Sequence, residues 1–332
     1  MDPWDHVRLV AERLAVEVDA DVILYNGKIE WRYDPALVSI CDSKLRPNVV
    51  LVLVTFGGDA DSAYRIARFL RATYKKVTVF TPSHCKSAGT LIVIGASEVV
   101  MTNTSELGPL DVQMSKPDEL DEVRSGFIIN DAFASLQHEA IDTFTQCLLD
   151  LKRKTGANIT LKTAMQIAGD LTGSLFSGLY SQIDPMHVGE AYRAGRVALE
   201  YAKRLNKGGL GVSDDVLTSL VSGYPSHSFV IDRAEAIELL GRKVRSATDT
   251  EFELAEILGI FAKFPFQSSK TGPLIEFLSA TKKEYDDASQ AVANQTIDPT
   301  TQDDRGTQHS GPGETDGGAE VTPFPQGGEG NS

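Results

Sequence analysis

Cysteine is scarce in this chain. The 332 residues include three cysteines that do not follow the spacing of a metal site, Cys41, Cys85 and Cys147. An odd and sparse set of this kind is consistent with reduced thiols and provides no disulfide framework. Cys85 precedes a candidate nucleophile by two residues, but we interpret it as a small packed side chain. We therefore expect neither a metal nor a cofactor.

Long apolar runs are also missing. The best candidate, residues 91–101, is interrupted by Ser97 and Glu98, whereas a helix that crosses a membrane needs roughly 18 or more apolar residues. The first residues, Met-Asp-Pro-Trp-Asp, are acidic and polar and do not form a basic-then-apolar leader. These features predict a cytoplasmic protein without a membrane span.

Positive charge is in deficit. The chain has 32 lysine and arginine residues against 46 aspartate and glutamate residues, which gives a formal net charge of −14. Residues 287–332 hold eight acidic side chains and one basic side chain, Arg305, so this segment contributes −7 of that total. Neither the body of the chain nor its acidic tail offers a basic surface for phosphates, and we expect no nucleic acid or anionic lipid as a partner.

The hydrophobic pattern alternates between the periods of strands and helices. Strands are predicted at 21–27, 49–56, 77–81 and 98–102, with helices at 60–73 and 87–95. Such alternation is typical of repeated βαβ units with parallel strands and right-handed crossovers. We therefore expect an α/β fold with a parallel sheet.

The remaining segments are predicted to be mostly helical. Helical spacing of apolar residues is found at 4–18, 131–155, 161–170, 186–205, 214–222, 233–240, 251–264 and 281–293. A stretch rich in glycine and serine, 172–184, is predicted to be a loop, and 228–231 is predicted to be a strand. The N-terminal helix could pack on its own domain or on a second subunit.

These segments define four regions. They are an N-terminal helix at 1–20, a main domain at 21–245, a helical extension at 246–293 and an acidic tail at 294–332. The tail consists mainly of Gly, Pro, Thr, Gln and acidic residues, with Phe324 as its single aromatic residue. Because this composition cannot bury enough apolar surface to offset the entropy of ordering, we expect the tail to be disordered.

One octapeptide joins a predicted strand to a predicted helix. Its sequence is Ser-His-Cys-Lys-Ser-Ala-Gly-Thr, residues 83–90, so that Ser87 lies at the turn. The free N–H groups of a first helical turn favour negative charge there. Ser87 is therefore a candidate nucleophile. Serine is also a common N-cap residue, and the octapeptide taken alone favours capping.

A glycine pair shifts that balance toward catalysis. The strand predicted at 49–56 runs into Gly57 and Gly58, which allow a sharp turn that leaves backbone N–H groups uncovered. If this turn and Ser87 end neighbouring strands, N–H groups near Gly57, Gly58 and Ala88 would form an oxyanion hole beside the nucleophile. We expect a Cβ atom at Gly58 to impair turnover more than folding.

Four blocks of sequence carry a family resemblance. They are 55–59 (Thr-Phe-Gly-Gly-Asp), 85–90 (Cys-Lys-Ser-Ala-Gly-Thr), 106–113 (Glu-Leu-Gly-Pro-Leu-Asp-Val-Gln) and 224–227 (Tyr-Pro-Ser-His). In this order they resemble the serine dehydrogenase proteinase family, which is grouped with signal peptide peptidase A and the Clp proteolytic subunit. The resemblance extends over about 21–244. It implies a ClpP/crotonase fold for the 21–245 domain and a serine-hydrolase site.

A serine nucleophile needs a base, which a third group often orients. Of six histidines, His227 belongs to one of the four blocks. The run from His227 to Ala236 is similar to the segment of the Clp proteolytic subunit that carries its triad aspartate, and Asp111 falls near the position of its triad histidine. The resemblance thus implies exchanged roles, with His227 as the base and Asp111 as its partner. The alternative is a buried histidine that bridges the turn at Pro225.

Relatives in the signal peptide peptidase branch use a lysine base on a helix after the nucleophile. Lys152, near the end of the helix predicted at 131–155, is the best counterpart by position. We rank it below His227, because a helical lysine without a matching motif is usually solvated. Lys86 is less suitable, because adjacent residues on a helix point about 100° apart.

The sequence leaves three functions open. The first is a soluble serine peptidase, acting as a homo-oligomer, that cleaves peptides or proteins through an acyl-enzyme on Ser87. The second is a catalytically silent scaffold that keeps the fold for oligomerisation and binding. The third is a crotonase-like acyl-coenzyme A enzyme, against which the run Lys-Ser-Ala-Gly at 86–89 argues. We expect the first.

Overall fold

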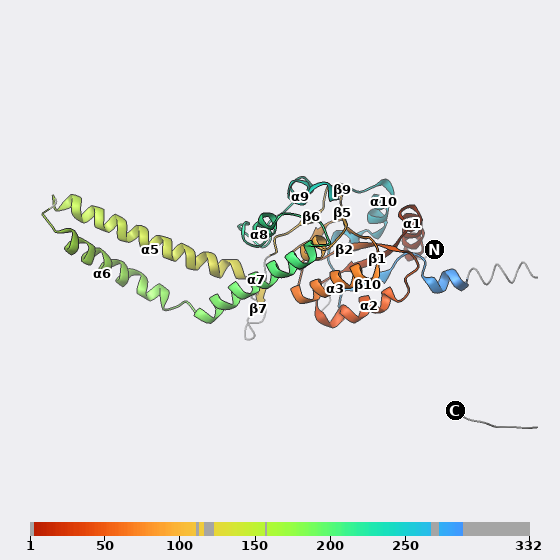
Figure 1. Ribbon diagram of the computed structural model, residues 1–332, viewed down its shortest axis with the longest axis horizontal. Coiled ribbons are helices and arrows are strands. Elements are labelled where there is room, and N and C mark those ends of the chain that lie inside the picture. Colours follow the sequence, from red (N-terminus) through yellow and green to blue (C-terminus); the bar gives the residue numbers. More distant parts are fainter. Residues whose placement is uncertain (1–2, 111–112, 116–122, 157, 267–271, 288–332) are drawn as a thin grey trace, which may run out of the picture. The chain divides into compact units, whose positions relative to one another are not determined.

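The largest sheet of the computed structural model has six strands, in the order β10-β1-β2-β3-β5-β9 (Figure 1). Its strands are β1 (Ala20–Asn26), β2 (Asn48–Val54), β3 (Val77–Thr81), β5 (Glu98–Met101), β9 (Val244–Ser246) and β10 (Leu274–Phe277). Neighbouring strands are parallel, except that β10 is antiparallel to β1. The predicted α/β fold with a mostly parallel sheet is confirmed.

The structure describes residues 3–110, 113–115, 123–156, 158–266 and 272–287. They lie within one unit that spans Met1–Ala288. Both Asp111 and the tail predicted at 294–332 fall outside the described residues. No helix among the described residues combines the length and the hydropathy that a membrane crossing requires.

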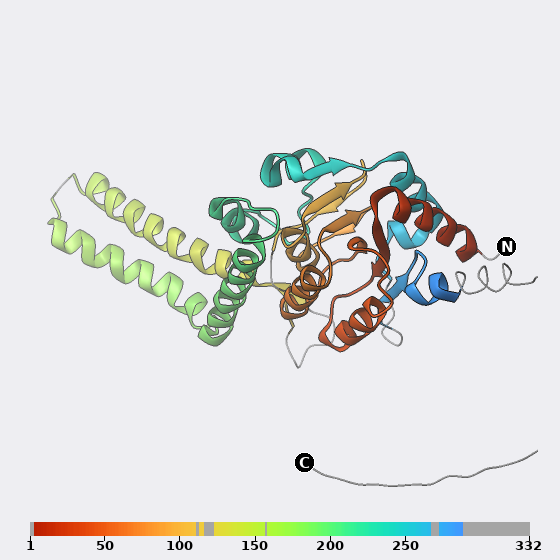
Figure 2. The same cartoon turned by 45° about the vertical axis from the view of Figure 1, so that its right-hand side comes forward.

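Helices cover both faces of the sheet (Figures 1 and 2). In β2, Val49, Leu51 and Leu53 belong to one buried apolar cluster, whereas Val50 and Val52 belong to another. The first cluster includes residues of α2 (Asp34–Cys41), α3 (Ala60–Thr73), α4 (Ala88–Ile94), α7 (Pro185–Asn206), α8 (Asp214–Ser222) and α9 (Arg233–Leu240). Because both faces are covered, the central strands are continuous apolar runs.

The second cluster holds the N-terminal helix, α1 (Pro3–Val18), on its own domain. Val10 and Leu14 of α1 are buried in the same cluster as Leu254 and Leu258 of α10 (Asp249–Leu258), and α1 contacts both α10 and β1. Of the two arrangements that the sequence left open, the structure shows packing within the chain.

Several short elements were not predicted. β4 (His84–Cys85) pairs with β6 (Glu106–Leu107) in parallel, and β7 (Gln113–Ser115) pairs with β8 (Val123–Ser125) in an antiparallel ladder. η1 (Trp31–Tyr33) and η2 (Gly241–Lys243) are single turns, and the helix predicted at 251–264 is divided at Gly259 into α10 (Asp249–Leu258) and α11 (Ile260–Lys263). The strand predicted at 228–231 was wrong, because only Ile231 pairs, through an isolated antiparallel bridge to Leu107.

Two long helices, α5 (Gly126–Lys154) and α6 (Leu161–Tyr180), lie side by side as a hairpin (Figures 1 and 2). Because α6 continues to Tyr180, the loop predicted at 172–184 was wrong. Ala164 and Ala168 are buried, and Thr172 and Phe176, which continue the same ridge at a spacing of four residues, are half-buried. Small side chains on the ridge let α5 approach closely, so helix packing overrides the weak helix propensity of the glycines and serines.

An ion pair with a buried carboxylate joins α10 to the sheet. Arg245 of β9 donates two hydrogen bonds of 2.7 Å to the carboxylate of Glu251 in α10. The Glu251 side chain is 0% exposed and closes a capping box with Thr248. The segment predicted as a helical extension therefore contributes to the core, and it also supplies the unpredicted edge strand β10.

We expect Arg245→Met to lower the free energy of unfolding by about 3–5 kcal/mol, because it leaves a buried carboxylate without its partner. Arg13→Met is the matched control. Arg13 pairs with Glu253, and both side chains are half-exposed, so its loss should cost about 0–1 kcal/mol. Urea unfolding would measure both variants. Equal, small changes would show that the Arg245 pair does not hold the segment.

Candidate active site

Ser87 and the glycine pair meet where β2 and β4 end. Thr55 and Cys85 form a parallel bridge, and the Lys86 N–H donates to the Thr55 carbonyl oxygen at 3.0 Å. Two residues further along both segments, this register places Gly57 beside Ser87. A Cβ atom on Gly57 would lie 2.8 Å from Cβ of Ser87 and 3.2 Å from its Oγ. The glycine turn therefore contacts the side chain of the candidate nucleophile.

The backbone of Ser87 is strained. Its φ of 50° and ψ of −114° fall outside the regions that residues with a side chain ordinarily occupy. Among the described non-glycine residues, only Asp19 also has a positive φ. Ser87 is the N-cap residue of α4, yet its side chain makes no capping hydrogen bond, so the capping interpretation is wrong. Strain of this kind costs about 1–3 kcal/mol and is typical of functional sites.

Thr55 fixes the conformation of the glycine turn, in which Gly57 has a φ of 107° and Gly58 a φ of 145°. The buried Thr55 hydroxyl accepts a hydrogen bond from the Gly57 N–H at 2.9 Å and donates one to the Gly57 carbonyl oxygen at 3.3 Å. Among the described residues, the structure shows no hydrogen-bond acceptor for the N–H groups of Gly58 and Ala88. The Gly57 N–H is thus used within the turn, whereas the other two are available to a ligand.

We expect Thr55→Val to lower kcat by about 10- to 100-fold, because the valine keeps the shape but releases the turn that positions backbone donors. The buried Gly57 N–H would also lose its acceptor, at a cost of about 1–3 kcal/mol in stability. Thr55→Ser keeps the hydroxyl and is the matched control. Peptide hydrolysis and thermal unfolding measure the two effects. A wild-type kcat in Thr55→Val would show that the hydroxyl does not organise the site.

A buried cation precedes the candidate nucleophile. The side chain of Lys86 is 8% exposed, and its Nζ lies 2.9 Å from Oε2 of Glu106. Nζ also donates to the carbonyl oxygens of Leu107 and Phe229, each at 3.3 Å. These three oxygen acceptors match the three N–H donors of an ammonium group. Sequence reasoning set Lys86 aside as a base but missed this ion pair, whose partners are distant along the chain.

Glu106 links the ion pair to a histidine. Burial acts to raise the pKa of Glu106, but the hydrogen bond and charge of Lys86, followed by His84, outweigh it and hold that pKa below its ordinary value. Nδ1 of His84 lies 3.4 Å from Oε2 of Glu106. The His84 ring also contacts the rings of Phe56 and Phe264, with centroid distances of 5.1 and 6.2 Å. A charged and aromatic cluster therefore flanks the glycine turn.

Of the other predicted site residues, the structure describes His227 and Lys152. His227 is half-buried and precedes by two residues Phe229, whose carbonyl oxygen accepts from Lys86. Asp111 lies outside the described residues. Lys152 is in the last turn of α5, where its Nζ donates to the Ile159 carbonyl oxygen at 3.0 Å and so bridges the turn to α6. The structure therefore connects the segment of His227 to the residue before Ser87.

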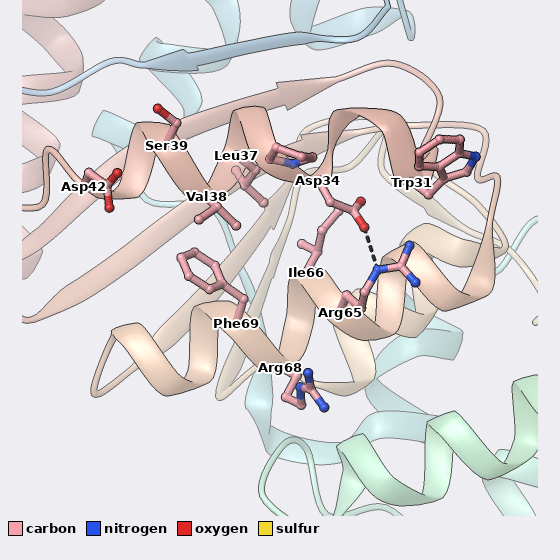
Figure 3. Close-up of a pocket in the computed structure, with 11 residues that line it drawn as sticks. Trp31, Asp34, Leu37, Val38, Ser39, Asp42, Arg65, Ile66, Arg68 and Phe69 are labelled. Atoms are coloured by element: carbon pink, nitrogen blue, oxygen red, sulfur yellow. Dashed lines mark hydrogen bonds and ion pairs between the residues drawn. The ribbon is translucent and has the colours of Figure 1, made fainter.

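A groove of about 800 Å³ lies between α2 and α3 (Figure 3). Its apolar lining residues include Leu37, Val38, Ile66 and Phe69, and an ion pair between Arg65 and Asp34, with Nε and Oδ2 2.7 Å apart, lies at one end. None of the predicted site residues lines it. The groove is thus separate from the candidate active site.

The part of the sequence that contains the candidate nucleophile matches a known family. Residues 39–193 match the sequence model of the ClpP-like SDH-type serine proteinases. This part of the chain is therefore similar to that family. The SDH-type proteinase region contains Ser87, the glycine pair, Ala88 and Lys152, whereas His227 lies beyond its end. The predicted family resemblance is confirmed over residues 39–193, which include the first three of the four sequence blocks.

Curated relatives of this chain align with it over a short segment. Two uncharacterized proteins of Methanocaldococcus jannaschii, MJ0137 and MJ1495, are each 35% identical to it over 66 residues. The alignment covers 20% of this chain and 23% of either relative. The chain thus matches less than a quarter of the length of these relatives.

Solved structures similar to this chain include two of the 1510-N membrane-bound stomatin-specific protease. One is a serine-to-alanine mutant, with a TM-score of 0.41, 13% identity, and coverage of 71% of this chain and 82% of that chain. The other is a lysine-to-alanine mutant in complex with a substrate peptide, with a TM-score of 0.42, 11% identity, and coverage of 82% and 96%.

Proposed function

We propose that this chain is a serine peptidase that cleaves peptide bonds through an acyl-enzyme on Ser87. The observation that carries the proposal is the strained, non-capping conformation of Ser87 beside the glycine turn, within a region of a serine proteinase family. Oγ of Ser87 attacks the carbonyl carbon, and the peptide C–N bond breaks as the amine takes the proton that Oγ has lost. Water then releases the acyl group and regenerates the serine.

In this proposal the oxyanion that forms during attack binds to backbone N–H groups of the glycine turn and of α4. Gly58 and Ala88 supply the donors, since the N–H of Gly57 is engaged by the Thr55 hydroxyl. Gly57 keeps the backbone close to Ser87, where a side chain would collide with its Cβ atom. Donors placed in advance cost no reorganisation when negative charge develops, which is why such sites accelerate acyl transfer.

We assign the general base to His227 and its orientation to Asp111, with Lys152 as the alternative base. The hydrogen bond between Lys86 and Phe229 supports this assignment, because it ties the segment of His227 to the turn that carries Ser87. Lys86 itself is not the base, since its amine is engaged by three oxygen atoms. Peptides or proteins are the proposed substrates, and a homo-oligomer and a cytoplasmic location stay predictions.

A fluorophosphonate probe tests the proposal. Such probes react with activated serines, so the full chain should acquire one adduct, and mass spectrometry should map it to residues 83–90. Hydrolysis of unstructured protein substrates would establish the peptidase activity. A chain that is neither labelled nor able to hydrolyse peptides would instead support the silent scaffold. An adduct on another serine would refute the assignment of Ser87.

A further inference from the structure

Lys86 joins three segments of the candidate site. It belongs to the turn of Ser87, its Nζ is paired with Glu106 at the start of β6, and it donates to Phe229 close to His227. We propose that the Lys86–Glu106 ion pair is a positioning device, which holds the segment of His227 against the turn of Ser87. This inference rests on the proposed function and adds two residues to its site.

The backbone and the side chain of Lys86 bind different segments of the site. The Lys86 N–H donates to the Thr55 carbonyl oxygen at 3.0 Å, which fixes the turn of Ser87 to the end of β2. The side chain of the same residue reaches the Phe229 carbonyl oxygen at 3.3 Å. Because Phe229 follows His227 by two residues, a single side chain limits how far the proposed base can move from the nucleophile.

Leu107 is the centre of a closed network of hydrogen bonds. Its carbonyl oxygen accepts from Nζ of Lys86 at 3.3 Å, and its backbone exchanges two hydrogen bonds with Ile231, at 2.9 and 3.0 Å. A Cβ atom on Gly108 would lie 2.7 Å from Cδ of Lys86, so the lysine stem packs directly on that glycine. The aliphatic part of Lys86 therefore fills a fitted space, and its charged end binds two backbone segments.

The stability that the Lys86–Glu106 ion pair provides is small. A buried ion pair contributes little to stability on balance, because desolvation offsets most of the attraction between the charges. The Lys86 side chain is 8% exposed, whereas that of Glu106 is 29% exposed, so the lysine bears most of the desolvation cost. An apolar side chain of similar length would avoid that cost but could not bind the Phe229 carbonyl oxygen. The buried position of Lys86 is thus better explained by a role in positioning the segment of His227 than by a contribution to stability.

The test compares Lys86→Met and Lys86→Arg with a matched control, Lys76→Met. Lys76 forms a similar pair with Glu98, with Nζ and Oε2 2.8 Å apart, but its side chain is 51% exposed and it pairs with neither Ser87 nor the segment of His227. We expect Lys86→Met to lower kcat and the rate of fluorophosphonate labelling of Ser87 by about 10- to 100-fold, the effect of a small misplacement of reacting groups. KM should change less than kcat, and Lys76→Met should change neither.

Two further readouts separate positioning from folding. The imidazole NMR resonances of His227 should shift in Lys86→Met and stay unchanged in Lys76→Met. Lys86→Arg, which keeps the charge and the donors, should recover part of the lost labelling rate. If Lys86→Met does not fold, Glu106→Gln replaces it, because that variant keeps the lysine and removes only the charge of its partner.

A folded Lys86→Met protein with the wild-type kcat, labelling rate and His227 resonances would overturn the inference. So would a loss of activity that disappears once the variant is assayed well below its unfolding temperature. Labelling of the wild type at Ser87 tests the proposed function by itself. Its failure would refute that proposal, whereas labelling at equal rates in all variants would refute only the role of Lys86.

Discussion

Ser87→Ala should abolish fluorophosphonate labelling and lower kcat for peptide hydrolysis by about 10⁴-fold or more, the loss expected when the nucleophile of an acyl-transfer site is removed. The variant retains a Cβ atom, so the strained backbone at a φ of 50° is as unfavourable as before. The unfolding temperature should therefore change little. A large loss of activity in a folded protein would identify Oγ as the reacting atom.

Ser83→Ala is the matched control from the same octapeptide. Ser83 is also buried, with 7% exposed, but its Oγ donates to the Ala262 carbonyl oxygen at 2.6 Å and so has a structural partner. Its loss should affect stability, while labelling of the remaining folded protein continues. Labelling that persists undiminished in Ser87→Ala, or vanishes equally in Ser83→Ala, would contradict the assignment.

His227→Gln should lower kcat by about 10⁴-fold, comparable to the loss of the nucleophile, because base and nucleophile act as one unit. Lys152→Met should retain most of the activity, since Lys152 bridges the turn between α5 and α6. His138→Gln is the control for histidine replacement, because the side chain of His138 is 77% exposed on α5. Steady-state hydrolysis of one peptide substrate by the three variants measures these effects.

The pH dependence gives an independent view of the base. If His227 accepts the proton, activity should fall as the solution becomes acidic, because a protonated imidazole cannot act as a base. A lysine base would need its neutral amine, and activity would then climb at alkaline pH. If Lys152→Met were inactive and His227→Gln active, the base would be Lys152, as in relatives of the signal peptide peptidase branch. If both variants were inactive, a structure with an inhibitor bound to Ser87 would decide between them.

The structure also changes how the oxyanion hole should be tested. From the sequence, Gly58→Ala was expected to impair turnover more than folding. A Cβ atom at Gly58 would lie 2.1 Å from the Ile29 carbonyl oxygen, and Gly58 has a φ of 145°, so this variant should lose stability as well. Thr55→Val changes the same turn from a position that accepts valine, and it is therefore the cleaner variant.

The sequence by itself determined the architecture and the two turns of the site. Apolar strands at 49–56 and 77–81, separated by an amphipathic helix, require a parallel arrangement covered on both faces. Parallel strands end at the same edge of a sheet. The sequence therefore predicts that Gly57 and Gly58, after one strand, lie near Ser87, after another. These features depend on local periodicity and burial, which residues close together in the sequence determine.

The tertiary structure alone decided the partners of Lys86, the course of α6 and the strained backbone of Ser87. Phe229, which accepts from Lys86, is 143 residues away along the chain, and no local pattern specifies such a contact. In α6, helix packing overrode a composition that favours a loop. The φ of 50° at Ser87 persists because the hydrogen bonds of β2 and β4 fix the chain on one side and α4 fixes it on the other, whereas an isolated octapeptide would relax to an ordinary capped turn.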